Sequence, residues 1–157
     1  MGTVPFSWRY DDLMQTILVP ISPGELLDKI TILRIKSQRM SDPAKLANVR
    51  HELELLERTW REASAGADVS DEERALEAVN TRLWVIEDDI REQEAAQAFD
   101  ARFIELARSV YIENDERAAI KKRINTRLGS KIVEEKSYKD YRQPGQSGQP
   151  GQPGQPR

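Results

Sequence analysis

Three polar residues, Asn114, Arg117 and Lys121, follow one another at a helical spacing of three and four in a segment whose pattern is otherwise largely apolar. They belong to one repeat, which consists of Phe103, Ala107, Val110, Asn114, Arg117, Lys121, Ile124 and Leu128. This spacing is typical of a helix face that packs against other helices. Because burying unpaired charge is costly, the amide and the two cations need carboxylate partners, a water-filled cleft or an anionic ligand.

The two cations admit two interpretations. Arg117 and Lys121 could hold a phosphate or a carboxylate, with bidentate geometry from the guanidinium. Alternatively, acids on neighbouring helices close a buried ion network that fixes the helix register. We expect the polar residues to converge with at least one of the acids Glu25, Asp28 and Glu87. The candidate ligand-binding residues are Asn114, Arg117, Lys121, Glu87, Glu25 and Lys29. The sequence leaves open whether this cluster is structural or functional.

Pairs of acids elsewhere could be interpreted as ligands for magnesium. The pairs are Glu25 with Asp28, Glu54 with Glu57, and Glu87 with Asp89. All-helical nucleotide pyrophosphohydrolases place such acids on facing helices around magnesium. Here the spacing is poor, and solvated helix faces and ion pairs account better for these acids. The sequence has 1 histidine, which excludes a histidine metal site. We therefore predict neither a metal nor a cofactor.

Composition limits the class of protein. The chain has 157 residues, 32% of them charged, with a net charge of −3 and no cysteine. A surface that mixes both signs has no general field for nucleic acid or an anionic membrane. No apolar run approaches the ~20 residues of a membrane span. The N-terminus lacks the apolar region of a signal peptide, so we expect a cytoplasmic protein.

The elements that must position the polar cluster are four helices. Ser22-Pro23-Gly24-Glu25 has a capping box with proline at the first helical position, and predicts a helix to about Met40. This helix has apolar residues on two sides, so we expect it to be central in a bundle or to lie at an interface. Later apolar repeats predict helices over about 43–63, 70–95 and 97–128.

Local signals mark the ends of the later helices and their pairing. Ser70 and Glu73 form a second capping box, and Gly129 is a C-terminal cap. Asn114-Asp115 favours a break in the last helix, because asparagine is a good N-cap. The short loop between 43–63 and 70–95 predicts a long antiparallel helical hairpin.

The sequence therefore predicts a mainly α fold, a helical bundle with this hairpin. Residues 16–19 and 131–133 could add a small two-stranded ribbon. We divide the chain into an irregular lead-in over 1–12, a single helical domain over 13–142 and a disordered tail rich in Gln, Pro and Gly over 143–157.

Several motifs together resemble an uncharacterised bacterial family, which is described only as a domain of unknown function. They lie in residues 20–33, 45–50, 83–91, 109–117 and 134–138, and include SPGELLDKITIL and NDERAAIKKRIN. The resemblance covers about residues 17–141 and implies a coherent domain. It carries no activity, ligand or catalytic residue to this chain.

Function is less constrained than fold. No nucleophile–base pair, metal triad or glycine-rich phosphate loop stands out, which favours a soluble binding or protein-interaction module over an enzyme. The two-sided apolar helix predicts self-association or a protein partner, and the polar cluster a small anionic ligand. The alternative is a small enzyme that acts on an anionic or nucleotide-phosphate substrate.

Overall fold

The computed structural model describes residues 16–141 of the chain. Four α-helices follow one another: α2 (Pro23–Arg39), α3 (Pro43–Ala63), α4 (Ser70–Ala95) and α5 (Ala101–Arg127). Helices account for 72% of this described part, and it contains no strand. The mainly α bundle is confirmed, and the ribbon between 16–19 and 131–133 does not form. The lead-in over 1–12 and the tail over 143–157 lie outside the described residues.

Capping explains where α2 begins and where α5 ends. The Ser22 hydroxyl accepts a hydrogen bond from the Glu25 backbone N–H at 3.3 Å, and Pro23 is the first helical residue. At the end of α5, Gly129 has a φ of 63°. Its N–H bonds to the Thr126 carbonyl, and the next N–H bonds to the Asn125 carbonyl at 2.8 Å. This is a Schellman motif, so the cap at Gly129 is confirmed, as is the N-cap Ser22. The reciprocal half of the predicted capping box does not form, because the Glu25 carboxylate is paired with Lys121.

The second predicted capping box, at the start of α4, is wrong. Val69 is the N-cap residue and makes no side-chain capping bond, and the Ser70 N–H donates to the Asp68 carboxylate at 3.0 Å. The Ser70 hydroxyl instead donates to Asp68, and the Glu73 carboxylate is engaged by Arg34 of α2. An interhelical ion pair therefore takes the carboxylate that the local motif would have used.

The predicted break in the last helix is also wrong, because α5 is continuous through Asn114. The Asn114 side chain donates a hydrogen bond to the Val110 carbonyl one turn earlier, at 2.8 Å. Asparagine favours an N-cap only where the helix must start, and here its amide is satisfied inside the helix.

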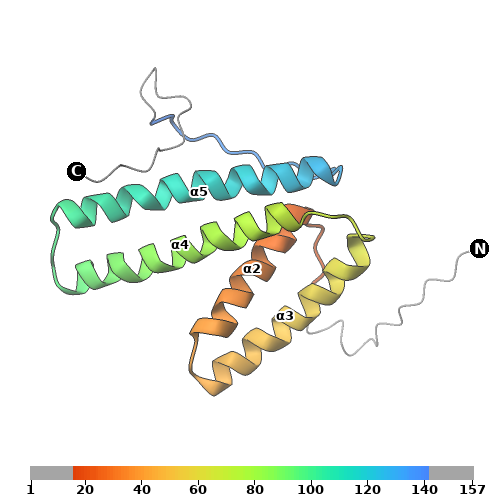
Figure 1. The fold of residues 1–157 in the computed structure, drawn as a ribbon, viewed down its shortest axis with the longest axis horizontal. Helices are drawn as coiled ribbons and strands as arrows, with labels where there is room; N and C mark the ends of the chain where they lie inside the picture. The colour runs from red at the N-terminus through yellow and green to blue at the C-terminus, as the bar shows by residue number, and fades with distance from the viewer. Residues whose placement is uncertain (1–15, 142–157) are drawn as a thin grey trace, which may run out of the picture.

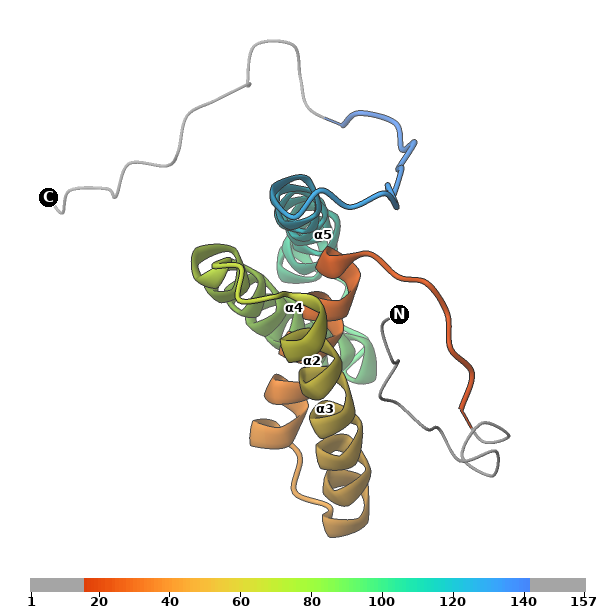
Figure 2. The ribbon, with the colours of Figure 1, turned by 90° about the vertical axis from the view of Figure 1, so that its right-hand side faces the viewer.

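The four helices form two antiparallel hairpins, α2 with α3 and α4 with α5 (Figures 1 and 2). The helix limits of the predicted hairpin over 43–63 and 70–95 agree with α3 and α4, but these two helices are not hairpin partners. Instead, α3 packs against α2, and α4 packs against α5 and α2. The reason is that α2 is apolar on two sides and lies between them. The expectation that this helix is central is confirmed, since α2 contacts all three others.

The main core lies where α2 crosses the start of α4 and the end of α5. Its buried members are Leu26, Leu27, Ile30, Val69, Leu76, Val79, Ile120 and Ile124. Burying each such aliphatic side chain contributes roughly 1.5–3 kcal/mol. None of the four helices is long and apolar enough to cross a membrane.

Gly24 allows the N-terminus of α2 to approach α5 closely. Its N–H donates a hydrogen bond to the Asn125 side-chain oxygen at 2.7 Å. A Cβ at this position would lie 2.6 Å from the Lys121 carbonyl oxygen, which belongs to the rigid backbone of α5. Only glycine therefore fits this crossing without moving one helix.

We expect Gly24→Ala to lower the free energy of unfolding by about 1–3 kcal/mol, because overpacking at the crossing exceeds the gain in helix propensity. Urea denaturation followed by circular dichroism would measure it. Ala44 occupies the same position after Pro43 in α3 and is exposed. The control Ala44→Gly should cost no more than about 1 kcal/mol. A Gly24→Ala protein as stable as the parent would contradict the close crossing.

Candidate functional site

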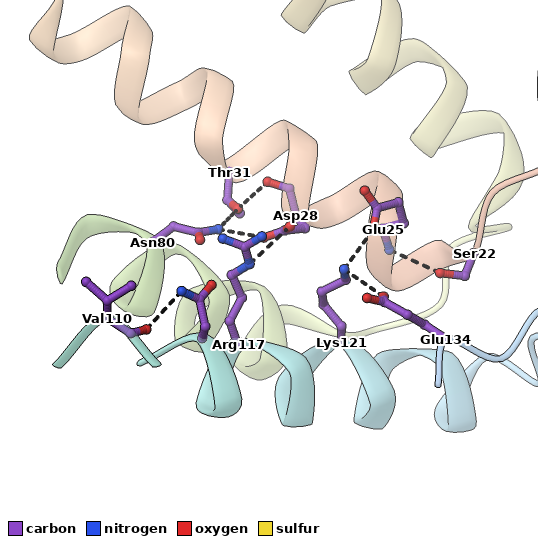
Figure 3. A network of polar contacts seen from close by, with 10 residues as sticks. Ser22, Glu25, Asp28, Thr31, Asn80, Val110, Arg117, Lys121 and Glu134 are labelled. Carbon is purple, nitrogen blue, oxygen red and sulfur yellow. Dashed lines mark hydrogen bonds and ion pairs between the residues drawn. The ribbon is translucent and has the colours of Figure 1, made fainter. Parts of the chain in front are cut away.

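A polar cluster lies between α2 and α5, beside the start of α4 (Figure 3). The first turns of α2 provide Glu25 and Asp28, and α5 provides Arg117 and Lys121. We refer to these four residues as the α2–α5 cluster. It joins two helices that are far apart in sequence, so it fixes how α2 sits on the α4–α5 hairpin.

Lys121 is the most buried cation of the cluster, with 7% of its side chain exposed. Its Nζ lies 2.7 Å from the Glu25 carboxylate and 2.8 Å from the Glu134 carboxylate, which comes from the segment after α5. Burial lowers the pKa of Lys121, but hydrogen bonds to Glu134 and Glu25 outweigh it and the pKa is raised. The Lys121 hydrogen bond in turn lowers the pKa of Glu134. The lysine is therefore held as a charged group in the interior.

Asp28 is the buried acid of the cluster, with 4% of its side chain exposed. One oxygen lies 3.4 Å from Nε of Arg117, and the other accepts a hydrogen bond from the Asn80 amide at 2.8 Å. Asn80 also donates to the Thr31 hydroxyl at 2.9 Å, and this hydroxyl donates to the Asp28 carbonyl. Both carboxylate oxygens of Asp28 therefore have a partner, which is what a buried carboxylate requires.

The structure brings together some of the predicted residues and leaves others out. Arg117 and Lys121 meet Asp28 and Glu25, as expected. Asn114 does not join them, because its amide bonds within α5. Glu87 forms a surface ion pair with Arg91 at 3.1 Å, and Lys29 is exposed on α2. The periodic pattern identified the correct face of α5, but it could not tell which part of that face α2 would contact.

Sequence reasoning missed Thr31, Asn80 and Glu134. Asn80 directly follows Val79 on the apolar face of α4, the same kind of polar interruption that singled out Arg117. Thr31 lies one turn after Asp28 and is uncharged, so a search for buried charges did not single it out. Glu134 lies outside any helix, so no periodicity could indicate its contact.

A second ion network joins α2 to α3 and α4. Arg34 donates to the Glu57 carboxylate at 3.0 Å and to the Glu73 carboxylate. Burial lowers the pKa of Arg34, but the bonds to Glu73 and Glu57 outweigh it and the pKa is raised. Arg34 thus links α3 to α4 through α2.

The acids considered above as magnesium ligands are found in ion pairs. Glu57 is paired with Arg34, Glu54 with Arg58 and Asp89 with Arg102. Within residues 16–141 no group of three acids or histidines could hold a metal ion.

Comparison with known proteins gives one match. The model of a family of unknown function matches residues 17–150, which include all four helices, the α2–α5 cluster and Glu134. No curated protein matches the chain. No solved structure matches it either.

The pairing of Arg117 with Asp28 predicts a non-additive mutant pair. Arg117→Met should lower the free energy of unfolding by about 1–3 kcal/mol, because it leaves a buried carboxylate without its cation. Adding Asp28→Asn, which can still accept from Asn80, should recover much of this loss. Arg82→Met, which removes an exposed interhelical pair with Glu113, should cost about 1 kcal/mol or less. Unchanged stability in Arg117→Met would contradict a structural role and favour a ligand site.

The shifted pKa values predict how attachment of Glu134 depends on pH. The pKa of Glu134 is lowered from 4.5, so its contribution to stability is present above pH 4.5 and is lost as the pH falls through the lower folded value. The pKa of Lys121 is raised from 10.5, so its contribution is complete below pH 10.5 and is lost above it. The stability difference between the parent and Glu134→Gln should be constant near neutral pH and shrink in acid. A difference independent of pH down to strong acid would contradict the contact.

Proposed function

We propose that this chain, which belongs to the family of unknown function DUF6165, is a protein-interaction module that associates with a second copy of itself. The contact surface is the end of the α4–α5 hairpin that extends beyond α2. We refer to residues 84–112 as the hairpin end. The observation that carries this proposal is an incomplete core in the hairpin end.

In Figure 1 the loop that joins α4 to α5 lies well away from α2 and α3. The polar contacts of α2 with the hairpin involve residues 73–80 of α4 and 117–125 of α5. From 84 to 119, Leu106 is the one fully buried apolar residue. Large apolar side chains are exposed there instead: Val85, Phe99, Ile104, Tyr111 and Ile112.

Two packed helices bury one face each and leave the opposite faces open. On α5, Ile104 is 57% exposed, and Tyr111 and Ile112 follow it two turns later at 39% and 45% exposed. This spacing is a second helical stripe, distinct from the one that contains Leu106. An exposed apolar stripe on a helix is the usual mark of a surface that another helix covers.

Charge favours a second copy as the partner. Residues 85–95 of α4 contain 5 acids and 1 arginine, whereas residues 101–112 of α5 contain 2 arginines and 1 acid. In an antiparallel pairing of two hairpins, α4 of one copy can lie beside α5 of the other. Arg102 is already paired with Asp89 of its own copy. The charges that can meet across the contact are therefore Arg108 of α5 and the acids Asp88, Glu92 and Glu94 of α4, and the same surface is used twice.

The α2–α5 cluster supports an interaction module more than an enzyme. Each of its two cations faces an acid from α2, so the cluster has a sufficient structural role without a substrate. A small enzyme acting on an anionic or nucleotide-phosphate substrate is the weaker alternative, since these interhelical contacts account for both cations without a reaction.

Self-association predicts that the mass rises with concentration toward that of a dimer. Sedimentation equilibrium would measure the mass. Ile104→Gln should weaken the dimer by at least about tenfold, because it removes a central apolar contact worth ~1.4 kcal/mol or more. The free energy of unfolding of the monomer should change little, since Ile104 is exposed.

Leu55→Gln is the matched control, because Leu55 is an exposed apolar residue on α3, outside the hairpin end. It should leave the dimer intact. A parent protein that stays monomeric at ~100 times a micromolar Kd would refute the proposal. Equal effects of the two variants on the dimer would refute it too.

A further inference from the structure

The segment after α5 turns back and follows this helix. Gly129 reverses the chain with its positive φ, and residues 131–141 are exposed, without helix or strand. Glu134 contacts Lys121, and the Tyr141 ring lies 4.6 Å from the Tyr111 ring, edge to face. Figure 1 shows this segment, in blue, on the side of α5 away from α4. We call residues 130–141 the C-terminal strap.

Glu134 is a third carboxylate beside two cations that are already matched. Asp28 faces Arg117 and Glu25 faces Lys121, and all four of these groups belong to helices. Glu134 adds a further negative charge from an irregular segment, and 44% of its side chain is exposed. The two cations and two acids of the α2–α5 cluster already balance each other, so the charge of Glu134 is not needed for neutrality.

Arg117 has donors left for an anion. Its Nε faces Asp28 and its side chain is 31% exposed. Among the contacts of the described residues, no hydrogen bond engages its two outer nitrogens. A guanidinium offers these nitrogens as a fork that fits carboxylate and phosphate oxygens. The charge of Arg117 contributes to the lowered pKa of Glu134, but the carboxylate of Glu134 lies against Lys121, at 2.8 Å, and the Arg117 guanidinium is directed at Asp28 (Figure 3).

The contact of Glu134 with Lys121 differs from a surface ion pair. Its ammonium group is buried, and Figure 3 shows the Glu25 and Glu134 carboxylates meeting it from opposite elements. If the strap leaves, a buried cation loses one of its two carboxylates. An oxyanion from outside could restore that contact without any change in the helices.

We propose that Lys121, with Arg117 one turn before it on α5, forms a binding site for an oxyanion, a carboxylate or a phosphate group, and that Glu134 occupies the oxyanion position at Lys121 as an internal ligand. An external oxyanion displaces Glu134 and releases the C-terminal strap from α5. Binding and strap release are therefore coupled, and each favours the other.

The test uses the full chain and inorganic phosphate or acetate as probes, at constant ionic strength set with sodium chloride. If the strap is closed about 90% of the time, removing Glu134 raises the apparent affinity about tenfold. Titration followed by calorimetry should therefore show phosphate or acetate binding Glu134→Gln about tenfold more tightly than the parent. The tighter of the two probes shows whether the site prefers a phosphate or a carboxylate group.

Glu135→Gln is the matched control, because it removes the same charge from the neighbouring residue, which is exposed. It should bind the probe as the parent does. In Glu134→Gln, replacing Lys121 with Met should abolish the gain. Should that protein not fold, Arg117→Lys, which keeps the charge but loses the fork, should reduce it.

Backbone NMR relaxation gives an independent readout of the strap. In the parent, a saturating probe should lower the order parameters of residues 131–141 and leave those of α2 unchanged. Equal affinities of Glu134→Gln and Glu135→Gln, no binding of either probe, or binding without increased motion of the strap would each overturn the proposal. Self-association through the hairpin end is tested separately, by sedimentation without either probe.

Discussion

The buried carboxylate of Asp28 is the constraint on which the arrangement of the helices depends. An ionised acid in the interior is tolerated only when its oxygens are hydrogen-bonded and a cation lies close. Arg117 and Asn80 meet this need from α5 and α4, so α2 has one acceptable register against both helices. The ion pair of Lys121 with Glu25 repeats the constraint one turn earlier on α2. Apolar packing alone would tolerate a sliding of one helix past another, whereas these contacts do not.

The first turns of α2 combine several demands in a few residues. Ser22 caps the helix, Gly24 permits close approach to α5, and Glu25 and Asp28 provide the acids. Between them, the apolar side chains of α2 enter the core against α4 and α5. These roles cannot be exchanged among neighbours, because each depends on the direction in which its position faces. The motif is thus explained by the geometry of one helix crossing, without any appeal to catalysis.

The two proposed activities use different parts of the molecule. Self-association uses the hairpin end, where the core is incomplete and apolar side chains are exposed. Oxyanion binding uses the outer edge of the α2–α5 cluster, where Glu134 is held by the strap rather than by a helix. They meet at Tyr111, which belongs to the hairpin end and touches Tyr141 of the strap. Release of the strap would uncover that ring, so the contact of Tyr111 with Tyr141 is where one event could influence the other.

The sequence by itself determined the four helices, the caps at Ser22 and Gly129, and the face of α5 on which Arg117 and Lys121 lie. These features depend on residues within one or two turns of each other, so spacing is enough to predict them. Tertiary structure alone decided that α3 pairs with α2, because several helices have similar apolar repeats and a short loop does not choose between them. It also decided that Asn114 stays within its helix and that Arg34, not a cap, engages Glu73. Glu134 could not be foreseen, since an irregular segment has no periodicity and only the fold brings it to Lys121.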